Sequence, residues 1–166
     1  MNLPAPHEWS PPPPSPPAAA PGPVLASYGR RILAWFVDLL IFAVPAFFVV
    51  AATVNLDAAD PVTSIPIGVS VGFALAFVIY QTVMVAWRGQ TVGAMSMSIK
   101  VIRLDDGAIP GWQPSAIRAL VPQVAGLVPI AGPFAVIVIH AWMFFDRQRQ
   151  GLQDKAAGTI VVTTRA

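Results

Sequence analysis

The feature that most constrains this chain is an apolar run from Ile32 to Val54 that contains a single charged residue, Asp38. As an α-helix this run would be about 34 Å long, enough to cross the ~30 Å hydrocarbon core of a bilayer. A carboxylate inside such a helix costs about 2.5 kcal/mol or more unless it is paired or hydrated. Arg31 precedes Asp38 by nearly two helical turns, so both side chains project from one face. Asp38 is therefore the first candidate for a polar site.

The composition indicates a membrane protein. Of the 166 residues, 55% are hydrophobic and 11% are charged, whereas about 25% are charged in a soluble domain. The net charge of +2, with cations dispersed among apolar segments, lacks the basic stripe of a nucleic-acid-binding protein. The absence of cysteine excludes disulfides, thiol catalysis and cysteine metal sites. The two histidines are far apart and form no metal motif, so we expect neither a metal nor a cofactor.

Residues 1–23 form a proline-rich segment ahead of the apolar part of the chain. They include ten prolines, and such a segment favours extended polyproline II structure and buries no core. We expect a disordered tail on the cytoplasmic side, followed by a membrane domain over residues 24–166. The alternative is that the tail binds a proline-recognising cytoplasmic partner.

A second apolar segment, Ile65–Trp87, predicts a second transmembrane helix. The connection 55–64 carries Asp57 and Asp60 but no Lys or Arg. Because Lys and Arg stay on the cytoplasmic side, the connection should be external and the N-terminus cytoplasmic.

Small residues recur along one face of this second helix. Gly68, Gly72 and Ala76 follow one another at a spacing of four, and small residues let helix backbones approach closely in lipid. The stripe is expected to pack on the first helix or on another copy of the protein.

The third apolar segment, Ala116–Phe145, is broken by prolines and glycines. Each half is roughly 18 to 24 Å long as a helix, short of ~30 Å. A straight span would also place the cation-bearing C-terminal tail outside, against the charge rule. A deep hairpin that turns near Val128–Pro133 fits both observations, and it places the C-terminus in the cytoplasm; a kinked span is the alternative. The breaks are Pro122, Gly126, Pro129, Gly132 and Pro133.

Short surface elements complete the expected fold. Ser98–Leu104 and Thr159–Thr164 have strand-like composition; pairing them would cover two bare edges, although each could also be an independent surface segment. Between the second helix and the first of these strands, Thr91 is placed to cap a short interfacial helix that presents Ala94 to the membrane. The fold class is therefore an all-α membrane protein with short surface strands.

Four charged residues are the candidates for a polar cluster or ion site: Arg31, Asp38, Arg118 and Asp154. In the structural reading, Asp38 pairs with Arg118 or Arg31 and locks the helices together; in the functional reading, Asp38 binds a cation or a proton. Three readings stay open for the region from Asp146 to Asp154. It forms a charged surface beside the membrane, its cations bind anionic lipid headgroups, or Asp154 contacts Arg31. The sequence shows neither a nucleophile–base pair nor a phosphate loop, so we do not expect an enzyme.

Several separated motifs resemble those of the RDD family of membrane proteins. Arg31, Ala34 and Asp38 look like the family's first-helix signature, and Gly89, Gln90, Thr91 and Gly93 look like its Gly-Gln-Thr-x-Gly motif. The stretches 101–107 and 151–159, together with Arg118, resemble later family motifs, so the likeness covers about residues 28–162. The family's Arg and two Asp correspond to Arg31, Asp38 and Asp154.

The resemblance implies a polytopic protein of the cell membrane with a transport or transport-associated role, such as sodium/proton exchange. The tail is similar to that of actinobacterial members of the proline-rich antigen type. The chain departs from the family pattern at Ala94, where a Lys is usual, and at Gln153, where a His is usual. The alternative function is a non-catalytic scaffold whose tail recruits a partner. With three apolar segments, a transporter would act as an oligomer.

Overall fold

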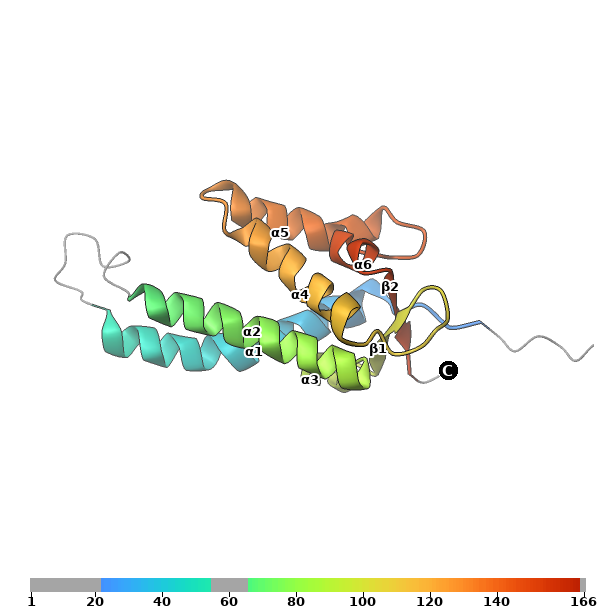
Figure 1. Ribbon diagram of the computed structural model, residues 1–166, viewed down its shortest axis with the longest axis horizontal. Coiled ribbons are helices and arrows are strands. Elements are labelled where there is room, and N and C mark those ends of the chain that lie inside the picture. Colours follow the sequence, from blue (N-terminus) through green and yellow to red (C-terminus); the bar gives the residue numbers. More distant parts are fainter. Residues whose placement is uncertain (1–21, 55–65, 165–166) are drawn as a thin grey trace, which may run out of the picture.

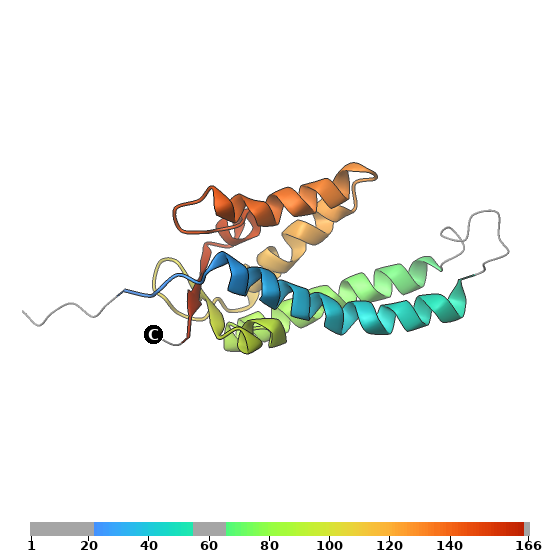
Figure 2. The same cartoon turned by 180° about the vertical axis from the view of Figure 1, so that it is seen from behind.

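The computed structural model describes residues 22–54 and 66–164. Two long helices, α1 (Tyr28–Thr53) and α2 (Ile67–Arg88), lie side by side, and a shorter pair, α4 (Trp112–Gly126) and α5 (Ala131–Ala141), diverges from them (Figures 1 and 2). The tail expected at 1–23 and the external connection expected at 55–64 fall almost wholly outside the described residues.

Both long helices have the length and apolar composition of membrane spans. Ser27 begins α1 by accepting a hydrogen bond from the Arg30 amide through its side chain, and α1 then continues through Pro45. The apolar side chains of both helices are mostly exposed, for example Phe47 at 68% and Ile67 at 81%. Exposed apolar surface of this extent fits a lipid environment and not water.

The third apolar segment forms two helices instead of one span. The chain turns between α4 and α5 at residues 127–130, so the two helices run back along each other (Figure 1). Ile130 adopts a left-handed backbone conformation, with φ of 63°, at the end of the turn. Pro122 lies within α4 and does not end it. The break predicted near Val128–Pro133 is present, and the kinked single span is not.

A small α/β unit closes one end of the helices. It contains α3 (Val92–Ser96), β1 (Ile99–Arg103), the 3₁₀ helix η1 (Trp142–Phe144), α6 (Leu152–Ala156) and β2 (Thr159–Thr163). The predicted pairing is confirmed: β1 and β2 are antiparallel, with Val101 opposite Val161. Leu25 forms a bridge to Val162, so the chain entering α1 lies beside the chain leaving β2.

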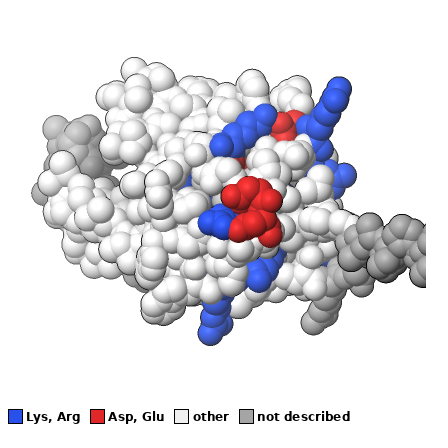
Figure 3. Space-filling model, turned by 45° about the vertical axis from the view of Figure 1, so that its right-hand side comes forward, with Lys and Arg blue, Asp and Glu red and all other residues white. Residues whose placement is uncertain are grey.

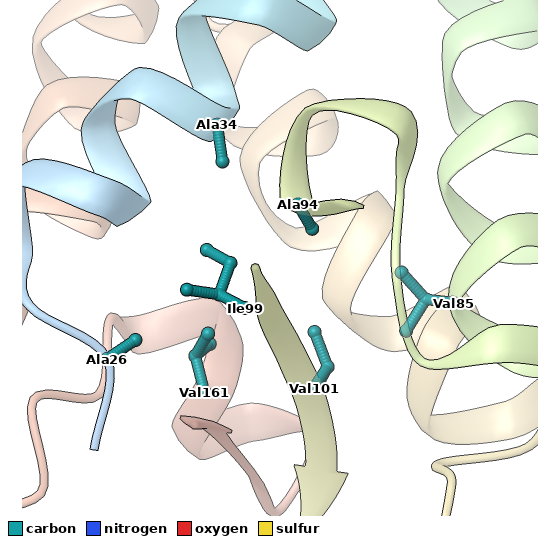
Figure 4. Packing of buried hydrophobic residues seen from close by; sticks show 7 residues of the cluster. All are labelled: Ala26, Ala34, Val85, Ala94, Ile99, Val101 and Val161. Carbon is teal, nitrogen blue, oxygen red and sulfur yellow. The ribbon is translucent and has the colours of Figure 1, made fainter. Parts of the chain in front are cut away.

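Figure 4 shows the apolar core of this unit. It draws on α1, α2, α3 and both strands, so it ties the small unit to the long helices. Ala94 belongs to this core and is 7% exposed. The prediction that Ala94 faces the membrane is therefore wrong, because α3 packs against α1. The core residues are Ala26, Ala34, Val85, Ala94, Ile99, Val101 and Val161.

Charged side chains are concentrated at one end of the molecule. Lys, Arg, Asp and Glu gather at the end that carries the sheet (Figure 3).

The small residues of α2 lie in open space. A Cβ added at Gly68 or Gly72 would meet no atom within 4 Å, and Ala76 is exposed. The small stripe therefore does not pack on α1 among the described residues; its contact with another copy stays a prediction.

Candidate functional site: two buried carboxylates beside one cavity

Asp38 is buried in α1 at 3% exposure, and neutral donors surround its carboxylate. Oδ1 accepts hydrogen bonds from the Tyr80 hydroxyl at 2.7 Å and from the Gly93 amide at 2.8 Å. Oδ2 accepts one from the Thr91 hydroxyl at 2.6 Å. Hydrogen bonds to a charged acceptor are stronger than those between neutral groups. Asp38 therefore joins α1 to α2 and to the start of α3.

The loop 89–93 has the backbone geometry that this contact requires. Gly89 ends α2 in a left-handed conformation with φ of 67°, and a Cβ there would lie 2.6 Å from the Val101 carbonyl oxygen. The side chain of Gln90 donates to the Ile99 carbonyl at 2.7 Å. A Cβ at Gly93 would collide with the Ala34 carbonyl. Glycine at 93 thus lets α3 approach α1 closely enough to reach Asp38.

Two hydroxyl groups extend the network around Asp38. The Thr91 hydroxyl, which donates to Asp38, accepts from the Ala94 amide at 3.2 Å, as expected for an N-cap residue. The Tyr80 hydroxyl accepts from the Val92 amide at 2.9 Å while donating to Asp38. Sequence reasoning did not assign Tyr80 to the site. Its hydroxyl in a mostly apolar helix was the available signal.

Asp154 is the second buried carboxylate, with no exposed surface. It pairs with Arg31 through Oδ2 and with Arg118 at 2.5 Å through Oδ1. The Gly151 amide also donates to Oδ2 at 3.1 Å, and Arg31 donates a further bond to the Arg149 carbonyl. Asp154 thereby connects α6 to α1 and α4. The Arg118 contact is an ion pair without the alignment of a hydrogen bond, since Nη1 and Oδ1 have no aligned partner within the described residues.

The four residues proposed as one cluster are therefore arranged differently in the structure. Arg31, Arg118 and Asp154 come together as an ionic group. Asp38 forms no ion pair with a described residue; it is satisfied by Tyr80, Thr91 and Gly93 instead. The spacing of Arg31 and Asp38 within α1 did not show that each has its own partners on other elements.

A cavity of about 650 Å³ lies between α1, α2, α4 and α5, next to both carboxylate centres. Its lining is mostly apolar, with aromatic rings from Trp35, Phe42, Phe73 and Phe77. Polar groups gather where the cavity meets the small unit. They are Arg31, Asp38, Gln81, Thr91, Arg118, Gln123, His140 and Gln153.

Two polar side chains on the cavity wall have an acceptor that no described residue uses. His140 contacts the Val136 carbonyl through Nδ1 at 2.9 Å, and because a carbonyl only accepts, Nδ1 carries the proton. Nε2 is then the basic nitrogen. Gln153 is 5% exposed, and its Oε1 has no hydrogen-bond partner among the residues described.

Asp146 and Lys155 of α6 form a surface pair at 2.5 Å. The Lys155 ammonium and the amides of Gln150 and Gln148 lower the pKa of the Asp146 carboxyl below its usual range. In the described part of the chain, no three His, Asp or Glu side chains are grouped so that they could bind a metal ion.

The polar side chains of this membrane domain therefore meet at one end of the helices. The model of the RDD family matches residues 25–158. The chain belongs to the RDD family. The match runs from the bridge residue Leu25 to the turn before β2, so both carboxylate centres of this RDD protein lie within it. No curated protein and no solved structure matches the chain.

The two positions at which the resemblance implied another residue, Ala94 and Gln153, lie in different surroundings. Ala94 is in the apolar core beside Ala34, where a longer charged side chain would have to leave the core to reach water. Gln153 lies on the cavity wall next to the Asp154 centre. Position 153 is thus the departure that bears on the cavity.

Proposed function

We propose that this RDD protein has a transport-associated role in the cytoplasmic membrane and that its solute binds in the cavity between the helix pairs. The observation that carries the proposal is that buried ionic groups from α1, α4 and α6 border a 650 Å³ space inside a domain with two membrane-competent helices. Ionisable groups at membrane depth commonly mark substrate or ion pathways. The cation-rich end is the cytoplasmic one in this proposal.

The electrostatics beside Arg118 favour an anionic group. Arg31 and Arg118 share the single carboxylate of Asp154, which leaves one positive charge in this group. Asp38 lines the same cavity and balances that charge overall, but its carboxylate is held apart by Tyr80, Thr91 and Gly93. We therefore assign Asp38 a structural role, holding the wall of the cavity.

Cation or proton exchange is the second candidate, and His140 supports it. With its proton on Nδ1, His140 offers Nε2 as a base on the cavity wall. In that mechanism His140, and not Asp38, would take up the proton. A scaffold role through the proline-rich tail is a separate hypothesis that concerns residues outside the described part.

Proteoliposomes containing the full chain test the proposal. Sodium-driven proton movement is followed with a pH-sensitive dye, and transbilayer movement of a fluorescent phosphatidylglycerol is followed by quenching from outside. One of these activities should exceed that of protein-free vesicles and should fall when the cavity is filled by Ala74→Phe. Leu75→Phe, on the same helix but exposed, outside the cavity lining and off the small-residue stripe, is the control. If neither activity exceeds the protein-free level, the transport proposal is wrong.

A further inference from the structure

The cavity is open toward the lipid-facing side of the helices. Among its large apolar lining residues, the most exposed lie on α1 and on the α5–η1 segment: Ile137 is 64% exposed, Phe144 51% and Ile32 46%. The ring pair of Trp35 and His140, 5.8 Å apart, connects α1 to α5 at the polar end of this opening. A molecule could therefore enter sideways from the bilayer between α1 and α5.

The polar end of the cavity holds one cationic side chain and one unused acceptor. Arg118 pairs through Nη1 with Asp154 Oδ1 at 2.5 Å and shares that carboxylate with Arg31. Gln153 Oε1 is a buried acceptor without a donor among the described residues, and a buried polar group in this state is costly. A ligand that supplies an anionic oxygen and a hydroxyl group would interact with both side chains.

We infer that the cavity binds an anionic phospholipid with a hydroxyl-bearing headgroup, such as phosphatidylglycerol, taken from the cytoplasmic leaflet. The phosphate faces Arg118, a headgroup hydroxyl faces Gln153, and an acyl chain lies along the apolar wall. The excess positive charge of the Asp154 group complements the phosphate, and the cavity volume is within the range of ligand pockets. The inference deepens the proposed function by naming its ligand class, but it concerns binding alone.

Tryptophan quenching by brominated lipid tests this binding. Trp35 lines the cavity, whereas Trp87 is 68% exposed and lies outside its lining. Two forms of the full chain, each with one of these tryptophans and phenylalanine at the other four positions, are placed in phosphatidylcholine nanodiscs. Brominated phosphatidylglycerol or brominated phosphatidylcholine is then added at low mole fraction.

Trp35 should be quenched at a several-fold lower mole fraction of phosphatidylglycerol than of phosphatidylcholine, and Trp87 should show no such preference. Arg118→Gln should weaken the preference by about tenfold or more, as expected for loss of a charged hydrogen bond. Ala74→Phe should also reduce it while leaving the ionic group intact, so a folding defect of Arg118→Gln does not decide the outcome. Leu75→Phe, at a position that is 57% exposed and outside the lining, should leave the preference unchanged.

Equal preference at Trp35 and Trp87 would show general attraction of anionic lipid to the basic end, and it would overturn the inference. No preference at either position would overturn it too. Because the assay involves no gradient and no movement, binding without flux would contradict only the transport proposal. Flux without binding would contradict only the lipid inference.

Discussion

Asp38 and Asp154 are both buried carboxylates of one small membrane domain, but different chemistry stabilises them. Asp154 is neutralised by Arg31 and Arg118, which come from two other helices. Asp38 is stabilised by two hydroxyls and an amide, all without net charge. The first centre connects distant parts of the chain by charge, whereas the second fixes the geometry of a local loop. Removing the carboxylate should therefore have unequal consequences.

The largest effect is expected for Asp154→Asn. The change leaves two arginines without their counter-ion in a site where Arg31 is 8% exposed. Breaking a buried pair in this way costs about 3–5 kcal/mol. Unfolding of the purified protein in mixed micelles, titrated with a denaturing detergent, measures the loss. Asp105→Asn, at a carboxylate that is 74% exposed, is the control and should have little effect. Similar midpoints for the two variants would contradict the ionic role of Asp154.

Asp38→Asn should be less damaging, at about 1–3 kcal/mol. The new amide keeps one acceptor oxygen, but its NH₂ group faces a hydroxyl or an amide that formerly donated. Thr91→Val, which removes one of these donors, should cost less in the Asp38→Asn background than in the wild type, by about 0.5 kcal/mol or more. A loss as large as that of Asp154→Asn would remove the distinction between the two centres.

Glycine 93 offers a test of the close approach that brings the donors to Asp38. Gly93→Ala should destabilise the protein by about 1–3 kcal/mol, because the added Cβ meets the Ala34 carbonyl. Gly68→Ala is the matched control within a helix, where the Cβ has open space and the higher helix propensity of alanine should stabilise by up to about 1 kcal/mol. The same sign for both substitutions would argue against tight packing of α3 on α1.

The smallest effect concerns pH and the surface pair near Asp154. The pKa of Asp146 is lowered in the folded state by Lys155 and by backbone amides. Asp146 therefore stabilises the fold above its unfolded pKa, and this contribution is lost as the pH falls below about 4, through the lowered pKa. Between pH 5 and pH 2.5, wild type should lose more stability than Asp146→Asn. Parallel curves would show that Asp146 does not contribute.

The sequence predicted the parts of this fold that depend on local composition. Two apolar runs of spanning length, a run broken by Pro and Gly, and two strand-like segments at one end correspond to α1, α2, the α4–α5 pair and the β1–β2 sheet. The interior position of Ala94 was missed, because apolar periodicity does not distinguish lipid from protein as the covering surface.

The residues of the candidate site could be predicted from the sequence. Which of them form ion pairs with one another could not. Arg31, Asp38, Arg118 and Asp154 stand out as rare charges, and each lines the cavity or borders it. Which carboxylate pairs with an arginine depends on where α6 and the loop 89–93 lie in space, and spacing within α1 contains no such information. Tyr80 and the cavity itself are products of that tertiary arrangement.

The most direct test of two separate centres is a double-mutant cycle between Asp38 and Arg118, with Asp38→Asn and Arg118→Gln measured singly and together by detergent-induced unfolding. If the centres are separate, the two losses of stability should add to within about 0.5 kcal/mol. A coupling of about 2 kcal/mol or more between Asp38 and Arg118 would mean that they form a direct ion pair, and it would contradict the account.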